Sequence, residues 1–321
     1  MAYSLETDES VRAGVLRSAG EQLDQAVREL TVRVDDDPVE AVHSARKAVK
    51  KERSLLRLAR GSLDRDQRRR ENGALRHAAR SLSTARDGEA MLETLDDLSE
   101  RYVGRLPETT FQKVRERLES RRDKERRELI GSSVAGLAAD ELHAVRARQG
   151  EWKFAEDGWP AIEQGLRRSY RDGRKLFSHI RSKPSSGEWH AWRKRVKDLW
   201  YQERLLAAVA GPAVKGQAKD AHALADLLGD EHDLDVLGTT LQSERMTPPV
   251  DLDAVIELIE FRRRELRADA VRLGARIYAE KPKRFVRRMR SSWEAGCAQE
   301  RASRDRDPAE LGRATARSPL A

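Results

Sequence analysis

Residues 43–50 read HSARKAVK, and residues 190–197 read HAWRKRVK. The His, Arg, Lys, Val and Lys positions agree without a gap, and an Arg-Leu pair follows each segment, at 57–58 and at 204–205. A second pair of segments, LSTARD at 82–87 and LGDEHD at 228–233, lies at nearly the same spacing. Two matched pairs in the same order indicate an internal duplication, in which each copy folds as one helical unit.

The sequence around these segments has a helical periodicity and lacks the runs of Val, Ile, Thr and aromatic residues that form strands. Hydrophobic residues make up 38% of the chain, aromatic residues 5% and charged residues 37%. A chain this polar can fold when its apolar residues are collected on one side of long helices. We therefore predict an all-α fold built from a duplicated bundle.

Clusters of proline, glycine and serine set the expected boundaries. We expect a first bundle over residues 8–131, a connecting segment over 132–157, a second bundle over 158–296 and a disordered tail over 297–321. Within the second bundle we expect separate helices at about 213–228 and 233–244, and a last helix that ends near Gly296.

The two matched segments are predicted to be helices with one basic face and one apolar face. At about 100° per residue, His43 and the shared cationic residues fall on one face, and Val42, Ala45 and Val49 fall behind. Residues 43–60 contain seven Lys or Arg residues and one acid, Glu52. Like charges at helical spacing cost about 0.2–0.5 kcal/mol per pair. Helix stability therefore does not explain the concentration of cations on this face, whereas binding of an anion does. The alternative is that the cations only form an ordinary solvent-exposed face.

We expect the two basic faces to line a single groove. In the first copy, the candidate ligands are His43, Arg46, Lys47, Lys50, Arg53 and Arg57. In the second copy, they are His190, Arg193, Lys194, Lys197, Tyr201 and Arg204. Further candidates are Arg76, Arg80, Arg86, Arg168, Tyr170, Arg171, Arg174 and His232. Such a row spans about 21 Å of helix, which suits an extended polymer better than a small ligand.

The composition indicates an anionic partner without choosing among nucleic acid, a membrane surface and a phosphate polymer. The net charge is +8 and the sequence pI is about 9.7. Sequence-nonspecific binding to RNA or DNA is the main alternative, but single-strand binders usually add stacking aromatic residues, and the basic faces offer only the two candidate tyrosines. A docking scaffold for acidic proteins is a further alternative. If the candidate histidines are ligands, binding tightens as the pH falls from about 7 to 6, and Gln at His43 and His190 removes this dependence.

The quoted motifs, in their order and doubling, resemble the CHAD family, named for a conserved histidine α-helical domain. The resemblance covers about residues 8–296 and includes Arg86-Asp87, His232-Asp233 and the late segment EKPKRFVRR. It implies two pseudo-symmetric antiparallel four-helix bundles that flank a basic central channel. It also implies binding of inorganic polyphosphate and association with polyphosphate granules. Because the Glu-x-Glu-x-Lys motif and strands of the triphosphate tunnel domain are missing from this sequence, we expect a stand-alone CHAD protein.

The sequence favours no enzymatic chemistry, and we expect neither a cofactor nor a metal. Glu40-x-x-His43 has the spacing of a di-iron helix, but the second copy has Gly187 in place of the Glu. His232-Asp233 weakly resembles a metal phosphohydrolase pair, and no glycine-rich phosphate loop occurs. With one cysteine, Cys297, no signal peptide and no run of 18 apolar residues, we expect a cytoplasmic protein at polyphosphate granules.

Overall fold

The computed structural model describes residues 3–82, 87–130, 133–182, 184–243 and 252–315, and these residues form an all-α fold without a β-sheet. Helices of the first half are α1 (Val11–Thr31), α2 (Pro38–Leu58), α3 (Arg65–Ser81), α4 (Asp87–Arg101), α5 (Glu108–Ile130) and α6 (Val134–Arg148). Helices of the second half are α7 (Gly158–Ile180), α8 (Ser186–Ala210), α9 (Pro212–Ser243), α10 (Leu252–Ile277) and α11 (Pro282–Thr315). Among the described residues, no helix is both long enough and apolar enough to cross a bilayer.

Helices α1, α2, α3 and α6 pack together as one bundle. Helix α6 lies in segment 132–157, which we expected to connect the two bundles, and it packs on α1 and α3 of the first bundle. Ala135, Ala138, Leu142 and Val145 are buried against the bundle at a helical spacing. Because most of these side chains are small, the helix has a weak hydrophobic pattern and lies close to its neighbours.

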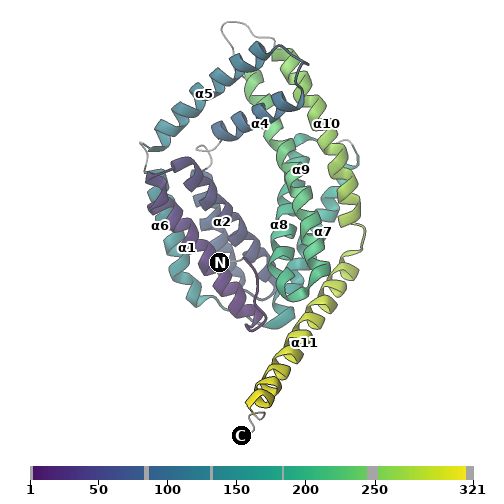
Figure 1. The fold of residues 1–321 in the computed structure, drawn as a ribbon. Helices are drawn as coiled ribbons and strands as arrows, with labels where there is room; N and C mark the ends of the chain where they lie inside the picture. Colours follow the sequence, from purple (N-terminus) through teal and green to yellow (C-terminus); the bar gives the residue numbers. More distant parts are fainter. Residues whose placement is uncertain (1–2, 83–86, 131–132, 183, 244–251, 316–321) are drawn as a thin grey trace, which may run out of the picture.

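Helices α4 and α5 do not complete the first bundle but form a second core with α9 and α10. Its buried side chains are Met91, Leu92, Leu95, Leu98, Phe111, Val114, Leu118, Leu234, Leu237, Leu241, Val255, Ile259 and Leu266. Figure 1 shows α4 and α5 lying between the first bundle and the upper ends of α9 and α10. The expected boundary near residue 131 therefore does not separate two packing units.

Helices α7 to α11 pack on one another and share one core with the first bundle, and two of them are longer than expected. The helices expected at 213–228 and 233–244 are one continuous helix, α9, because Gly229 is accommodated inside it. Helix α11 continues past Gly296 to Thr315, so the expected helix end is wrong, and the helix covers much of the segment expected to be disordered. At Gly296 the helix lies so close to the backbone of Val209 that a Cβ would approach the Val209 carbonyl oxygen to 1.8 Å.

The C-terminal halves of α2 and α8 lie against each other and join the two sides of the molecule. The Ser54 hydroxyl donates to the Asp198 carbonyl at 3.1 Å, and the Gln202 amide donates to the Ser54 carbonyl at 3.4 Å. Ser54 is thus buried in this contact. The crossing holds the N-terminal parts of the two basic faces on either side of a shared space.

Gly165 sets how closely α7 approaches the end of α2, and it provides a test of the packing. A Cβ at Gly165 would lie 1.8 Å from the Leu58 carbonyl oxygen and 2.5 Å from that of Arg57, both backbone atoms. We expect Gly165→Ala to lower the free energy of unfolding by about 1–3 kcal/mol because the helices must separate. The control is Gly73→Ala in α3, where no atom lies within 4 Å of the added Cβ. There, higher helix propensity should raise stability by about 0.5–1 kcal/mol. Denaturant unfolding measures both, and equal effects would contradict the close approach.

Candidate basic pocket

A pocket of about 620 Å³ lies where the basic faces of α2 and α8 converge, with α3 and α9 closing it. We call it the basic pocket. Its lining residues are Arg46, Val49, Lys50, Arg53, Arg57, Arg76, Ala79, Arg80, His190, Arg193, Lys194, Arg195, Lys197, Asp198, Tyr201 and His232. The volume falls in the usual range of ligand sites, about 300–1,000 Å³.

The charge balance of the basic pocket is strongly one-sided. Ten of its lining residues are Lys or Arg, and Asp198 is the one acid among them. Asp198 is already paired, because it lies 2.9 Å from the Arg57 guanidinium and 3.2 Å from that of Arg195. Its carboxylate therefore offsets only part of the positive charge, and the pocket has a large excess of cationic groups.

Crowding and burial lower the pKa values of several of these cations. Burial, followed by the neighbouring Arg57 and Arg76, lowers the pKa of Arg53 to about 10. Burial and the neighbouring Arg195 and Arg53 lower the pKa of Lys194. Both effects disfavour the charged form. A bound anion would reverse the electrostatic part of this effect, so the arrangement is better suited to an anion complex than to the empty pocket.

Two buried nitrogen atoms at the pocket have no hydrogen-bond partner among the described residues. They are Arg193 Nε and His190 Nδ1. Buried donors without partners are costly in a folded protein. Both side chains line the basic pocket, so a ligand bound there can supply a partner for each atom.

His190 and His232 lie together at one end of the pocket, with ring centroids 4.3 Å apart. Burial, then Arg193 and His190, lowers the pKa of His232 to about 4, against weaker raising effects of Asp233 and Asp235. Burial and the neighbouring Lys194 and Arg193 lower the pKa of His190 as well. Both rings are therefore neutral near pH 7, and the pH window expected from ordinary histidines moves to lower pH.

We expect anion affinity to rise as the pH falls from about 6.5 toward 4. A phosphate beside the rings stabilises the imidazolium form and therefore raises the histidine pKa. The complex then binds a proton that the free protein, whose histidine pKa is depressed, does not bind. Because binding is coupled to this proton uptake, a lower pH favours the complex. The His190→Gln, His232→Gln double variant should remove most of this dependence, whereas His179→Gln, at an exposed site on α7, should keep it. Isothermal titration at several pH values measures the effect. An unchanged pH profile in the double variant would show that the two rings are not ligands.

The pocket gathers most but not all of the predicted residues of α2 and α8. His43, Lys47 and Arg204 are not among its lining residues. Lys47 and Arg204 lie beside Lys51, where burial and these two charges lower the Lys51 pKa to about 8. They form an edge next to the pocket. Tyr201 lines the pocket wall but is only 3% exposed. Arg86 lies outside the described residues.

The predicted residues of α7 do not join the basic pocket. Tyr170 is buried, and its hydroxyl donates to the carbonyls of Ile277 and Glu280 at 3.0 and 3.1 Å. Its prediction as a ligand is therefore wrong, because α10 and α11 cover this face of α7. Arg171 and Arg174 line a separate depression between α7, α10 and α11. Arg168 lies near the end of α2, beside Arg60.

Arg195 is a pocket residue that the sequence interpretation missed. Its counterpart in the first copy is Ala48, which is buried in the core. The comparison of the two copies therefore left position 195 out of the shared cationic residues. The positive charge of Arg195 itself was the signal in the sequence that the cationic surface of α8 is wider than that of α2.

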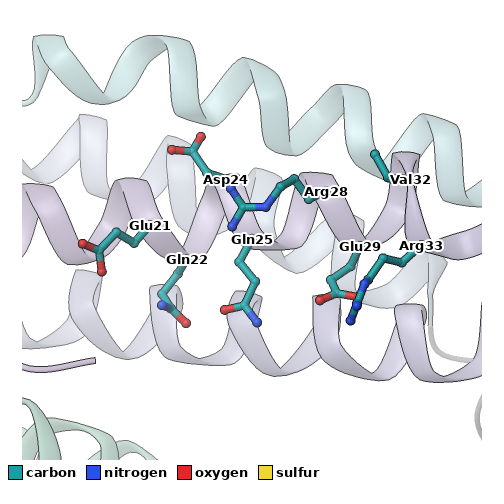
Figure 2. Close-up of a pocket in the computed structure, with 8 residues that line it drawn as sticks. All are labelled: Glu21, Gln22, Asp24, Gln25, Arg28, Glu29, Val32 and Arg33. Atoms are coloured by element: carbon teal, nitrogen blue, oxygen red, sulfur yellow. The ribbon is translucent and has the colours of Figure 1, made fainter. Parts of the chain in front are cut away.

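A further depression lies along α1 and has a different character. Figure 2 shows its lining residues, which are Glu21, Gln22, Asp24, Gln25, Arg28, Glu29, Val32 and Arg33. It combines three acidic and two basic side chains, and no predicted ligand lines it. In the described parts of the chain, no three His, Cys, Asp or Glu side chains are placed to hold a metal ion.

Solved structures with the same fold support the architecture. PptA from Streptomyces chartreusis superposes with a TM-score of 0.58 at 16% identity, over 85% of this chain and 100% of that chain. The crystal structure of the CHAD domain from the plant Ricinus communis superposes with a TM-score of 0.58 at 18% identity, over 88% of this chain and 96% of that chain. At these identities the similarity concerns the fold alone. Comparison with curated proteins gives no significant match.

The sequence itself matches a family model. The model of the CHAD domain aligns with residues 17–242, more than half of the 321 residues, and this range includes every residue that lines the basic pocket. Together with the matching fold, this alignment shows that the chain belongs to the CHAD domain family.

Proposed function

We propose that this protein binds inorganic polyphosphate in the basic pocket. One observation carries the proposal: ten Lys and Arg side chains from α2, α3 and α8 converge on one space whose single carboxylate is already paired. Lys acts on phosphate as a point charge, and Arg can bind two phosphate oxygens at once. A polymer with a negative charge on every unit can contact many of these groups together. Membership of the CHAD domain family, and the polyphosphate binding that the sequence resemblance implies, favour the same ligand.

The proposed role is binding without catalysis, and it includes placement of the protein at polyphosphate granules. The cationic groups are spread along about 16 Å of α2, from Arg46 to Arg57, rather than focused on one bond. An extended row of this kind suits retention of a polymer. Ten of the lining side chains are cations that can hold phosphate, and this composition favours binding over a reaction.

Binding to single-stranded nucleic acid is the main alternative, and the aromatic residues weigh against it. Base stacking needs an accessible ring face. Tyr201 is the one aromatic residue of the pocket apart from the two histidines. It is 3% exposed and stacks on Trp200, with ring centroids 4.6 Å apart. The site therefore offers many phosphate contacts and little stacking surface.

A competition titration distinguishes the two ligands. Labelled long-chain polyphosphate is bound to the protein, and unlabelled RNA is added at increasing phosphate excess. We expect RNA to displace polyphosphate poorly, and the affinity for polyphosphate to fall steeply with salt because each contact releases counterions. Displacement at equal phosphate concentrations would contradict the proposal and favour a general nucleic-acid binder. The same assay with tripolyphosphate shows how much affinity the pocket alone supplies.

A further inference from the structure

The cationic row of α2 does not end where the basic pocket ends. Arg46, Lys50, Arg53, Arg57 and Arg60 follow one another at intervals of three or four residues, so they form one stripe along the helix. The first four line the pocket. Arg60 lies just after α2, in the short 3-10 helix Ala59–Gly61, about 4.5 Å further along the axis.

Helix α3 carries a second stripe that runs beside the first in the opposite direction. Arg80, Arg76, Asn72 and Arg68 follow at intervals of four residues, and Arg80 and Arg76 line the pocket. The Arg53 Nε donates to the Asn72 amide oxygen at 3.2 Å, which fixes the pairing of the stripes. Arg68 therefore stands beside Arg60 at the end of the row.

Helix α7 brings a third arginine to this point. The missing side chain of Gly165 allows α7 to touch the carbonyls of Arg57 and Leu58, and Gly61 leaves room for the Gln164 side chain. Arg168, one helical turn after Gly165, thereby lies beside Arg60. Its side chain is 52% exposed and its nearest acid is Asp172, at 3.5 Å.

The surroundings of Arg60 and Arg68 leave their charges unbalanced. Neither forms an ion pair with a described carboxylate, and the Nε atom of each is buried without a hydrogen-bond partner among the described residues. Burial and the proximity of Arg168 and Arg68 lower the pKa of Arg60 to about 10. Burial and the neighbouring Arg69 and Arg168 lower the pKa of Arg68. Arg68 also lies in the first turn of α3, where a positive charge opposes the helix dipole.

We propose that Arg60, Arg68 and Arg168 form an exit site, where a polyphosphate chain that fills the basic pocket continues over the end of α2 between α3 and α7. This inference rests on the proposed function and adds the direction in which a long chain leaves the pocket. The stripe from Arg46 to Arg60 spans about 21 Å, against about 16 Å for the part inside the pocket. A short chain is held by the pocket alone, and a long chain contacts both sites.

The test compares two ligands and two triple variants. We expect Arg60→Gln, Arg68→Gln, Arg168→Gln to weaken long-chain polyphosphate binding by about tenfold or more. The slope of log K against log[salt] should become shallower by up to about three, one unit for each lost phosphate contact. Tripolyphosphate binding should stay within about twofold of the unsubstituted protein. The control is Arg181→Gln, Arg284→Gln, Arg287→Gln, which removes the same charge from exposed positions outside the pocket.

Each outcome has a distinct meaning. Equal weakening by the two triple variants would overturn the exit site, because general attraction would then explain the effect. Equal loss for both ligands in the first variant would overturn it too, since the three arginines would then act within the pocket. If the unsubstituted protein binds neither ligand, the proposed function itself fails. Retained tripolyphosphate binding proves that the variant is folded. If the triple variant does not fold, the single variant Arg168→Gln, at an exposed position, should still weaken binding of the long chain selectively. The proposal is overturned if Arg168→Gln shows no such selective loss.

Discussion

Charge reversal at Lys50, Lys194 and Lys197 is expected to abolish polyphosphate binding and to leave the protein folded. All three side chains line the basic pocket, and none of them is buried. Each substitution by Glu removes a charge-assisted phosphate contact of about 1.5 kcal/mol or more and adds repulsion. The three together should weaken binding by about a thousandfold or more. Isothermal titration with long-chain polyphosphate measures the loss, and circular dichroism checks the helical content.

A matched control separates the pocket from the overall charge. Lys113, Lys215 and Lys219 are exposed and do not line the pocket, so their replacement by Glu makes the same change in net charge elsewhere. We expect this control to lower the affinity only through the long-range electrostatic attraction between protein and polyphosphate. Salt near 0.15 M largely screens that attraction. An affinity of the pocket variant within a few fold of the control would refute the assignment of the site.

Asp198→Asn is expected to destabilise the free protein and to increase the stabilisation that polyphosphate provides. Asp198 is 6% exposed, and its carboxylate lies between Arg57 and Arg195. Its removal leaves two crowded guanidinium groups without their counter-charge, at a cost of about 2–4 kcal/mol in the free energy of unfolding, somewhat below a fully buried pair. Phosphate oxygens can replace the lost carboxylate, so the bound variant recovers much of this stability. Denaturant unfolding with and without polyphosphate measures both effects.

The control for this prediction is an exposed ion pair on α11. Arg290 and Glu294 lie 2.7 Å apart, and their side chains are 52% and 56% exposed. We expect Glu294→Gln to change stability by less than about 1 kcal/mol and to leave the effect of polyphosphate unchanged. If polyphosphate stabilises Asp198→Asn no more than the unsubstituted protein, the carboxylate does not lie where phosphate binds.

The helical class and the central location of the site could be predicted because they depend on local patterns. The spacing of His, Arg and Lys in residues 43–57 and 190–204 determines which side of each helix is basic. The apolar sides must be covered by the rest of the bundle, which leaves the basic sides free to converge. The pocket indeed gathers Arg46, Lys50, His190 and Arg193. Their role as phosphate ligands stays a prediction, as does the common origin of the two copies.

The errors arose where packing partners are distant in the sequence. Periodicity shows that α7 has a buried side but not which helix covers it, so Tyr170 was placed among ligands although it bonds to carbonyls of residues 277 and 280. In the same way, no local pattern indicates that α4 and α5 pack on α9 and α10. The packing of helix α6 could not be read from its sequence because alanine contributes little to a hydrophobic pattern. Arg195 was missed because the first copy has Ala48 at that position.

The most direct test of the central claim is a crystal structure of the protein with tripolyphosphate bound. We expect the phosphates to lie between α2, α3 and α8, with oxygens within hydrogen-bond distance of Arg193 and of the lysines that line the basic pocket. Phosphates bound only in the depression between α7, α10 and α11, or only on the outer surface, would contradict the account.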